Sequence, residues 1–492
     1  MRGRTGSHEI ALPATSSAPS GIELQTDLSP IELFAVLRSA LPGVQAALLE
    51  SSALDPHLGR YSYVAFDPVT SLVHQAGACY LRARGEGRWK PVSDDPFRAV
   101  SRLVARGSRA TAPELPPFQG GVIGYFGYDL SRGIERLPET TVDDLHLPDL
   151  AVGLYEWVIA YDHARGRAWL VSAADSQTPE QATKLDSIRR IAEAPAGSAH
   201  LPPAALPQRT RVESTFTRDE YLKVVQQAIE YIRAGDIYQV CLSQRLSANI
   251  GTDAFDQYQR LRAASPAPYG ACLEYGGFAL ASISPELFLR LSGRTVETRP
   301  IKGTRPRGAN PLADAALVAE LAASTKDRAE NLMIVDLLRN DIGRVCETGS
   351  VHVPSLFDIE SHATVHHMVS VVRGQLRPEM NPVDLLRACF PGGSVTGCPK
   401  IRAMEIIDEL EPTRRGPYCG AIGFIGFDGA MDTSIAIRTA VVTGNSTHFQ
   451  VGGAVVADSD PDDEYQETLD KGRAFLTACN AEPPDPTWDR HG

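Results

Sequence analysis

Short runs rich in β-branched and aromatic residues recur along the whole chain, and they constrain its fold more than any other feature. Such runs predict strands at 46–50, 61–66, 120–128, 237–246, 277–282, 287–291, 294–300, 418–427, 433–442 and 447–456. Amphipathic spacing and capping residues predict helices from Thr217 to Gly235 and at 314–341, 382–389, 400–410 and 462–479. Because these helices do not alternate regularly with the strands, a parallel Rossmann-type sheet is disfavoured, and we expect a layered α+β fold.

A proline-rich stretch divides the chain into two unequal parts. The 492-residue length favours two domains, with three as the alternative. The stretch 193–214 has no apolar period and contains four prolines among alanine, glycine and serine, which is typical of a linker. We therefore expect a disordered tail at 1–20, an N-terminal domain at 21–192, the linker at 193–214, a second domain at 215–480 and a tail at 481–492.

Charge and composition exclude several classes of partner. The formal net charge is −12 and lysine and arginine form no basic stripe, so neither nucleic acid nor an anionic membrane is an expected partner. An anionic small molecule is compatible with this charge, because a local cluster of basic residues can be positive inside an acidic protein. The eight cysteines are scattered without a Cys-x-x-Cys pair, and the N-terminus lacks the apolar core of a signal peptide. No apolar run is long enough for a membrane helix, so we expect a cytoplasmic protein.

Two predicted helices each carry a pair of carboxylates on one face. In the last helix Glu464, Glu467 and Lys471 stand at i, i+3 and i+7, within about 60° of one another at 100° per residue. In the long helix near residue 330, Asp327 and Glu330 are also three residues apart. Magnesium takes one or two protein carboxylates and fills its other positions with water and substrate oxygens, so such pairs are compatible with a magnesium site. Exposed faces with ordinary ion pairs are the simpler interpretation of either helix alone.

Glu286 and Lys302 are the candidate acid and nucleophile. Glu286 follows Pro285 at the end of a predicted strand, where burial would raise its pKa and allow it to protonate a leaving hydroxyl. Lys302 follows the predicted strand at 294–300, so its side chain would project into a loop near three arginines, Arg299, Arg305 and Arg307. Neighbouring cations and burial lower the pKa of an ammonium group, which makes a lysine nucleophilic. An exposed glutamate and a basic surface loop are the alternative interpretations.

Two glycine-rich segments and one arginine are candidates for binding an anion. The segment 391–400 is a Gly/Ser/Thr loop that opens a helix, and such loops present backbone N–H groups to anions. Gly452 and Gly453 would let a carboxylate approach the backbone, although glycines at a strand bulge are commoner. Arg438 lies within a predicted strand and is a candidate bidentate partner of a carboxylate.

The second domain contains a dense series of ordered motifs between Thr217 and Cys479. They are Gly235-Asp236-Ile237-Tyr238-Gln239, Ser284-Pro285-Glu286, Pro300-Ile301-Lys302-Gly303-Thr304, Asp336-Leu337-Leu338-Arg339-Asn340-Asp341, His366-His367-Met368-Val369-Ser370, Ser394-Val395-Thr396-Gly397, Tyr418-Cys419-Gly420-Ala421-Ile422-Gly423 and Gly452-Gly453-Ala454. In this order they resemble the chorismate-utilising enzymes, which include anthranilate synthase component I, aminodeoxychorismate synthase component I and the isochorismate and salicylate synthases. The resemblance implies an anthranilate-synthase component I-like layered α+β fold of mostly antiparallel sheets packed with helices.

The resemblance also implies roles for individual residues. Glu330 and Glu467 would bind Mg²⁺ directly, with Asp327 and Glu464 behind them, and the ion would hold one carboxylate of chorismate. The residues implied to bind the other carboxylate are Arg438, Tyr418, Gly453 and Lys471. The further substrate-binding residues are Gln239, Thr304, Ser394 and Gly452, and the catalytic residues are Lys302, Glu286 and His367, with Glu286 as the acid at the C4 hydroxyl.

Two positions distinguish the branches of this family. Members that use water as nucleophile carry a lysine base where this chain has Gln239, and glutamine cannot take a proton from water. Anthranilate synthases typically read Pro-Ile-Ala-Gly-Thr where this chain has Lys302, whereas aminodeoxychorismate synthases typically read Pro-Ile-Lys-Gly-Thr. The resemblance therefore implies a transferase that aminates chorismate to 4-amino-4-deoxychorismate, for p-aminobenzoate and folate synthesis, with Lys302 as covalent nucleophile. Anthranilate synthase component I and an inactive chorismate- or tryptophan-binding regulatory subunit are the alternatives.

Two further partners follow from the resemblance. We find no amidotransferase segment in the chain, so the implied source of ammonia is a separate glutamine amidotransferase subunit, or free ammonium. Leu49, Glu50, Ser51 and Arg60 resemble the tryptophan pocket of feedback-inhibited anthranilate synthases. Tryptophan is therefore a further expected ligand. Because such a pocket also persists in aminodeoxychorismate synthases, it does not distinguish the two branches.

Overall fold

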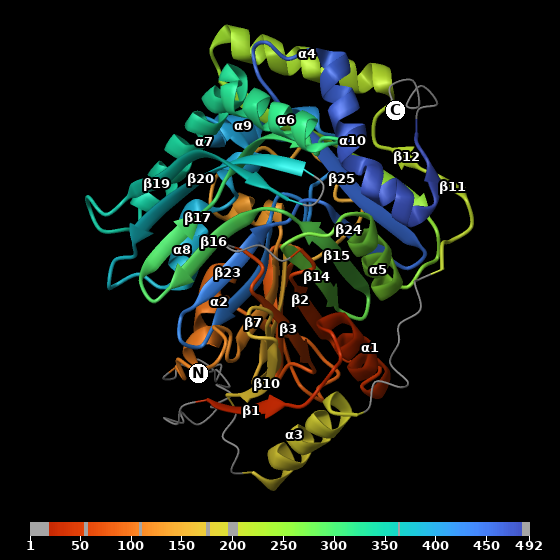
Figure 1. Cartoon of the computed structure of the whole chain (residues 1–492), viewed down its shortest axis with the longest axis vertical. Helices are drawn as coiled ribbons and strands as arrows, with labels where there is room; N and C mark the ends of the chain where they lie inside the picture. The colour runs from red at the N-terminus through yellow and green to blue at the C-terminus, as the bar shows by residue number, and fades with distance from the viewer. Residues whose placement is uncertain are drawn as a thin grey trace, which may run out of the picture.

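Two large sheets form the centre of the molecule (Figure 1). The computed structural model describes residues 19–53, 58–107, 111–173, 178–194, 205–362 and 365–484. The first sheet has the order β1(Ser20–Leu24), β10(Arg167–Ser172), β9(Trp157–Asp162), β3(Tyr61–Phe66), β2(Ala46–Glu50), β14(Tyr269–Glu274), β15(Phe278–Ser284), β24(Thr439–Thr443), β25(Ser446–Val455), β13(Gln239–Asn249) and β12(Glu213–Ser214), and β21(Gly397–Cys398) also pairs with β13. The second has the order β18(Ile301–Pro306), β20(Val365–Gln375), β17(Thr295–Thr298), β16(Leu287–Ser292), β23(Met431–Ile435), β22(Ala421–Gly426), β7(Gly121–Phe126), β8(Leu150–Tyr155), β4(Thr70–Gln75), β5(Ala78–Ala83) and β6(Lys90–Val92), and β19(His352–Ser361) also pairs with β20.

Helices cover the outer faces of these sheets. They are α1(Pro30–Ala40), α2(Pro96–Ala105), α3(Pro179–Ala192), α4(Arg218–Ala234), α5(Ala254–Ala264), α6(Pro311–Ala323), α7(Thr325–Gly343), α8(Pro382–Cys389), α9(Lys400–Leu410) and α10(Pro461–Cys479), with short 3-10 turns at Tyr128–Gly133 and Gly393–Val395. One apolar cluster lies between the two sheets, and two others join each sheet to its helices. The strand pairs within both large sheets are antiparallel. The expected layered α+β fold with mostly antiparallel sheets is confirmed.

Strands from both predicted domains share both sheets. In the first sheet β2 pairs with β14, and Leu48 lies opposite Cys272. In the second sheet β7 pairs with β22, and Gly124 lies opposite Gly423. Residues 21–192 and 215–480 therefore do not form two separate sheets. Each sheet contains strands from both parts of the chain, and these strands are hydrogen-bonded to each other.

Capping residues place the ends of α4 where the sequence predicts them. Thr217 caps the first turn, with its hydroxyl accepting from the Glu220 N–H while the Glu220 carboxylate accepts from the Thr217 backbone. Gly235 ends the helix in the left-handed conformation, with φ at 85°. The predicted helices at 382–389, 400–410 and 462–479 agree with α8, α9 and α10 to within one residue.

The single helix predicted at 314–341 is wrong, because two helices occupy this region. Ser324 separates α6 from α7 with an extended backbone, at φ −64° and ψ 110°. Its hydroxyl accepts from the N–H of Asp327 and so starts a new helix at Thr325, five residues before Glu330. Three helices of the first 192 residues, α1 to α3, were also absent from the sequence-based prediction.

Three functional positions differ from their predicted secondary structure. Lys302 does not lie in a loop after a strand, because β18 continues through it from Ile301 to Pro306. Arg438 lies between β23 and β24 in a left-handed turn with φ at 49°, so the strand predicted at 433–442 is in fact two strands. Tyr418 precedes β22, since the next residue, Cys419, also has positive φ at 63°.

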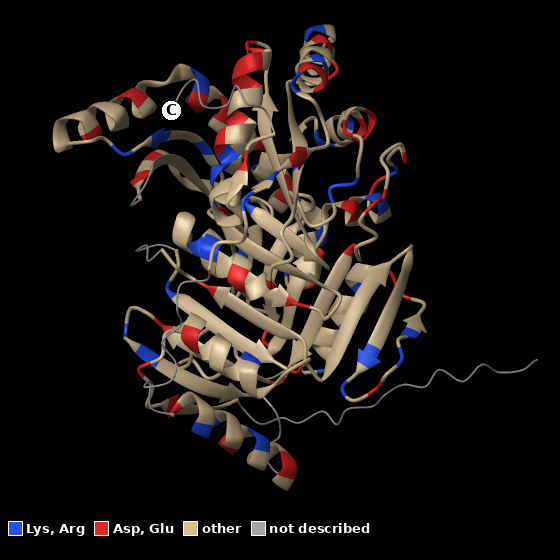
Figure 2. Ribbon diagram, turned by 90° about the vertical axis from the view of Figure 1, so that its right-hand side faces the viewer, with Lys and Arg blue, Asp and Glu red and all other residues tan. Residues whose placement is uncertain are grey.

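The predicted tails and linker are only partly within the described residues. Residues 1–18, 195–204 and 485–492 lie outside them. The remaining part of the predicted linker contains β11(Thr210–Arg211), which pairs in parallel with β26(Ala481–Glu482). Figure 2 shows acidic and basic residues interspersed on the helices. Among the described residues, no helix combines the length and apolarity needed to cross a bilayer.

We expect Leu48→Ala to destabilise the whole structure by about 3 kcal/mol, the usual cost of removing a buried leucine side chain. Leu48 is 0% exposed on β2, the strand that joins the two parts of the first sheet. Urea denaturation followed by fluorescence and circular dichroism should show one shifted transition. Leu206→Ala, at a leucine that is 62% exposed, is the control and should change stability by less than about 0.5 kcal/mol. Separate transitions for the two parts of the chain would contradict this expectation.

Candidate active site

Glu286 lies between β15 and β16 with its carboxylate in the interior. It is 6% exposed, and Ser394 Oγ donates a hydrogen bond of 2.6 Å to its Oε1. Burial raises the pKa of Glu286 to about 6, against the opposing effects of the Ser394 hydroxyl and Lys302. A carboxyl group with this pKa can give or take a proton near neutral pH. Glu286 is therefore not the exposed glutamate of the simpler interpretation.

Lys302 is partly buried on β18 among acidic groups. Burial lowers the pKa of Lys302, but Cys241, Glu330 and Glu286 raise it more, and the net pKa lies above the ordinary value of lysine. The prediction that nearby arginines lower this pKa is wrong, because carboxylates neutralise them. The pairs are Arg299 with Glu360, Arg305 with Glu320 and Arg307 with Asp314. Lys302 is thus an ammonium ion in the resting site, and it could act as a nucleophile only after losing a proton.

Two carboxylates of α10, Glu464 and Glu467, lie near Gly453 of β25. A Cβ atom added at Gly453 would lie 2.8 Å from Glu464 Oε2 and 3.6 Å from Glu467 Oε1. Burial raises the pKa of Glu330, Lys302 opposes this rise, and Glu467 adds to it. Glu330 and Glu467 come from two helices that are distant in sequence, and they lie close enough to affect each other electrostatically.

The carboxylates of α7 and α10 differ in their partners. Glu464 Oε2 is buried without a hydrogen-bond partner, and burial raises the pKa of Glu464 to about 7. Glu467 is paired with Lys471, whose Nζ lies 2.6 Å from Oε1, and Asp327 accepts from Arg305 at 3.3 Å. Among the described residues, no three His, Cys, Asp or Glu side chains form a group that could hold a metal ion. A bound ion would thus need ligands from substrate and water, as magnesium commonly does.

His367 and Thr304 face each other across β20 and β18. Thr304 Oγ1 lies 2.9 Å from His367 Nδ1. Burial lowers the pKa of His367 to about 3, and Arg438 lowers it further, so the ring is neutral and the guanidinium is nearby. Among the described residues the Arg438 guanidinium has no hydrogen-bond or ion-pair partner, and burial lowers its pKa. An unpaired, partly buried guanidinium is suited to bind a carboxylate that enters the site.

Gly452, Tyr418 and Lys471 form a second part of the site. A Cβ atom at Gly452 would lie 2.9 Å from the Tyr418 hydroxyl oxygen. Lys471 Nζ donates to the Gly452 carbonyl at 2.9 Å. The absence of a side chain at Gly452 therefore keeps the Tyr418 hydroxyl and the Lys471 ammonium near the same stretch of β25.

Gln239 is buried at the start of β13 beside the loop that carries Ser394. It is 0% exposed, and its Oε1 has no hydrogen-bond partner. Its Nε2 lies 3.8 Å from the Cys241 sulfur, and the Cys241 thiol in turn donates to the Ser394 carbonyl at 3.5 Å. Gln239 and Cys241 thus lie on an interior surface of β13 that contacts the loop carrying Ser394.

Comparisons with known proteins identify the family of the chain. The family model described as chorismate binding enzyme matches residues 45–477. The chain belongs to the chorismate-binding enzyme family. It is 43% identical over 432 residues to aminodeoxychorismate synthase component 1 of Escherichia coli, which is 88% of this chain and 92% of that protein. It is also 46% identical over 386 residues to anthranilate synthase component 1 of Thermus thermophilus, which is 78% of this chain and 82% of that protein.

A solved structure supports the same assignment. The crystal structure of anthranilate synthase component I from Streptococcus pneumoniae aligns with a TM-score of 0.76 and 32% sequence identity. The alignment covers 86% of this chain and 93% of that chain. The layered fold predicted from the resemblance to the chorismate-utilising family is therefore confirmed.

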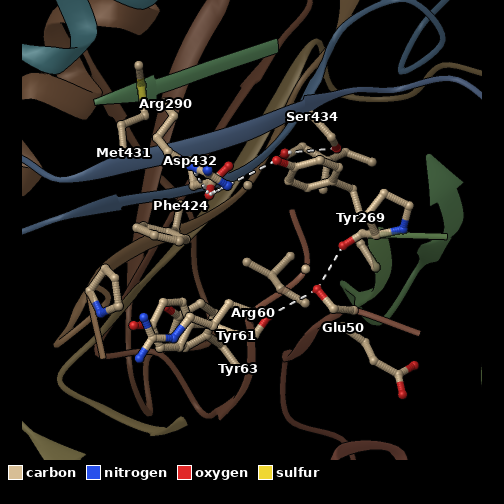
Figure 3. Close-up of a pocket in the computed structure, with 18 of the residues that line it drawn as sticks. Glu50, Arg60, Tyr61, Tyr63, Tyr269, Arg290, Phe424, Met431, Asp432 and Ser434 are labelled. Atoms are coloured by element: carbon tan, nitrogen blue, oxygen red, sulfur yellow. Dashed lines mark hydrogen bonds and ion pairs between the residues drawn. The ribbon is translucent and has the colours of Figure 1, made fainter. Parts of the chain in front are cut away.

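This member of the chorismate-binding family also contains a cavity of about 280 Å³ between the two sheets (Figure 3), and Lys302 is not among the residues that line it. All four residues of the predicted tryptophan pocket, Leu49, Glu50, Ser51 and Arg60, line it. The aromatic residues in its lining are Tyr61, Tyr63, Tyr269 and Phe424. The Glu50 carboxylate points away from the cavity, since it accepts from Arg262 at 2.8 and 2.9 Å and from the Tyr258 hydroxyl at 2.7 Å. At the other end Asp432 Oδ1 is buried without a hydrogen-bond partner.

Two residues of the site were not among the predicted functional residues. Cys241 contacts Gln239 and raises the pKa of Lys302, and its position two residues after Gln239 on one strand face was a usable signal. Arg415 contacts β13 and the loop at 391–399, and no local pattern marks it in the sequence. Its role depends on contacts between segments that are far apart along the chain.

We expect His367→Gln to make folding less sensitive to acid. The pKa of His367 is about 3 in the folded protein, against 6.5 for a free histidine, so the unfolded chain binds more protons between these values. Protonation therefore favours unfolding as the pH falls, and this residue should account for about 2 kcal/mol of stability lost between pH 7 and pH 5. Urea denaturation at both pH values should show a loss smaller by that amount in the variant. His146→Gln, at a side chain that is 79% exposed, should lose as much as the unmodified protein.

Proposed function

We propose that this chain is aminodeoxychorismate synthase component I, which converts chorismate and ammonia into 4-amino-4-deoxychorismate. The observation that carries the proposal is Lys302 beside Glu286 in a chorismate-family site, where anthranilate synthases typically have alanine in place of this lysine. Relatives named aminodeoxychorismate synthase component 1 are 43–44% identical to the chain, and those named anthranilate synthase component 1 are 36–46% identical. Sequence identity alone therefore does not distinguish the two functions. The product, an intermediate with its enolpyruvyl group retained, would serve p-aminobenzoate and folate synthesis.

The coupled acid and amine support a two-step displacement. Transfer of a proton from Lys302 to Glu286 produces a free amine and a carboxylic acid in one step, and it is uphill because the lysine has the higher pKa. The amine of Lys302 then attacks C2 of the ring while the double bonds shift and the C4 hydroxyl leaves as water with the proton of Glu286. Ammonia attacks C4, the double bonds shift back, and the C2–N bond breaks to release Lys302. Such covalent catalysis divides one difficult substitution into two easier ones.

The cationic groups of the site would hold the carboxylates of chorismate. Arg438 has no competing partner among the described residues, and the neutral ring of His367 nearby leaves its charge available. Tyr418, Lys471 and the backbone at Gly452 and Gly453 would complete the contacts to the enolpyruvyl carboxylate. Ser394 and Thr304 would line the ring side, since they already contact Glu286 and His367.

Magnesium is the cofactor that this arrangement suits. Glu330 and Glu467 would bind the ion directly, and Asp327 and Glu464 would support them. When bound, the ion would neutralise the ring carboxylate of the substrate and hold it in place. The orphaned oxygen of Glu464 near Gly453 supports this assignment.

Gln239 supports ammonia and not water as the second nucleophile. A neutral side-chain amide has no titratable group near pH 7, so it cannot activate water as a lysine base would. Its buried Oε1 lacks a hydrogen-bond partner and can accept one from an N–H group. The relatives named component 1 imply a partner component, and we infer a separate cytoplasmic glutamine amidotransferase that supplies ammonia.

The cavity between the sheets is the proposed tryptophan site. Its aromatic lining and its size suit an indole ring, and Asp432 Oδ1 offers a free acceptor for an ammonium group. Because Glu50 is already bound by Arg262 and Tyr258, we assign it to the wall of the cavity and not to direct contact with the amino group.

The proposed function is tested by product analysis. With chorismate, ammonium and magnesium, we expect the purified protein to form 4-amino-4-deoxychorismate without releasing pyruvate. Mass spectrometry identifies the product and lactate dehydrogenase measures pyruvate. Anthranilate formed together with pyruvate would favour the alternative function, and no consumption of chorismate would favour an inactive binding subunit.

We expect Lys302→Ala to reduce formation of 4-amino-4-deoxychorismate by about 100-fold or more, the lower end of what a positioned catalytic group contributes. Lys302→Arg keeps the positive charge among the carboxylates but removes the nucleophilic amine, so it should be equally impaired. Initial rates with saturating ammonium measure both. Full activity in the arginine variant would show that Lys302 acts only through its charge.

A further inference from the structure

One edge of β13 is incomplete beside the active site. Odd-numbered residues of this strand direct their backbone groups to the edge opposite β25. Gln239 pairs with Cys398 of β21, and Ser247 pairs with Glu213 of β12 at the other end. Between these two short strands, the Cys241 N–H donates to the Thr396 carbonyl at 2.8 Å, but the Cys241 carbonyl and the Ser243 N–H have no partner on a neighbouring strand. Buried backbone groups of this kind need other partners.

A buried ion pair fills this gap. Glu411 Oε1 accepts from the Ser243 N–H at 2.8 Å, and an Arg415 nitrogen donates to the Cys241 carbonyl at 2.7 Å. The two side chains also bond each other at 2.6 and 2.9 Å, and each is 2% exposed. The Glu411 carboxylate and the Arg415 guanidinium thus supply the acceptor and the donor that the backbone of a neighbouring strand would otherwise supply.

The same guanidinium reaches two other parts of the active site. Arg415 donates to the Val395 carbonyl at 3.2 Å, directly after Ser394, whose hydroxyl holds Glu286. Its Cζ also lies 5.6 Å from the ring centroid of Tyr418, within range of a cation–π contact. A further contact with the ring of Tyr128, at 4.8 Å, fixes it from another direction.

We propose that the Arg415–Glu411 pair positions the active site by holding the Cys241 end of β13, the Ser394 loop and Tyr418 in one arrangement. Arg415 is accordingly a positioning residue, since it contacts none of the reacting atoms. This positioning role depends on the proposed amination in one respect only, which is that the amination is the reaction used to assay it. A guanidinium is suited to this task because its donors diverge in one plane, so it can bond two carbonyls and a carboxylate at once.

Lysine cannot replace this arginine without loss of alignment. Its ammonium is a single point at the end of a flexible chain and cannot reach Cys241, Val395 and Glu411 with the same geometry. A shift of about 1 Å in the Ser394 loop is enough to lower a rate by roughly 100-fold when groups must be aligned for reaction. The effect should therefore appear in catalysis even in a variant that folds.

The test compares Arg415→Lys and Glu411→Gln with Asp341→Asn. The control removes the charge of another buried carboxylate, which pairs with Lys400 at 2.6 Å and is 4% exposed. Steady-state rates with chorismate and ammonium give kcat and KM for each variant. Hydrogen exchange of the peptide 237–249 reports the Ser243 N–H, and thermal unfolding reports stability.

We expect kcat/KM for chorismate to fall by about 10-fold or more in both variants of the pair, with a higher KM and faster exchange in β13. The control should remain within about two-fold of the unmodified protein even if its melting temperature falls equally. The proposal is overturned if the folded Glu411→Gln variant, which is the milder change, keeps both normal kinetics and normal exchange, or if its kinetics change no more than those of Asp341→Asn.

Failure of the proposed function gives a different result. If the unmodified protein releases pyruvate and anthranilate, the amination proposal fails, and the ratio of variant to unmodified activity is then measured on anthranilate. The positioning role is judged from that ratio in either case.

Discussion

The antiparallel pairing of β2 with β14 and of β7 with β22 is the constraint on which the rest of the structure depends. These ladders join segments from both parts of the chain within each sheet, so neither part has a complete set of hydrogen-bond partners alone. The cavity between the sheets follows from the same pairing, because its wall combines Tyr61 from the first part with Tyr269 from the second. The proposed catalytic residues, in contrast, all come from the second part.

Charge balance determines how the candidate active site can work. Burial lowers the pKa of Lys302, but Cys241 and the carboxylates of a strand end, α7 and α10 raise it more, so its pKa stays high. The same lysine opposes the rise in the pKa of Glu286 caused by burial. The carboxyl group of Glu286 and the amine of Lys302 are therefore a coupled pair, and moving a proton between them would prepare both for the proposed reaction. Arg299, Arg305 and Arg307 are paired with carboxylates of the protein. Arg438 differs from them, because the carboxylate that we expect it to bind belongs to the substrate.

The cavity and the active site share two strands. Arg290 on β16 and Asp432 on β23 form an ion pair in the cavity wall, at 2.8 Å. Glu286 immediately precedes β16, and its carbonyl accepts from the N–H of Ile435 at the end of β23. Since both strands are packed between the sheet neighbours on either side, the shape of the cavity and the position of Glu286 depend on the same backbone.

The sequence by itself determined the features that depend on neighbours along the chain. The caps of α4, the common face of Glu464, Glu467 and Lys471 and the family motifs could all be predicted, because helix periodicity and capping act within a few residues. Only the tertiary structure decided the direction of the Lys302 pKa, the left-handed turn at Arg438 and the role of Arg415. Each of these depends on carboxylates, carbonyls or rings that lie far away in sequence, and their distances are set by the folded sheets and not by local pattern.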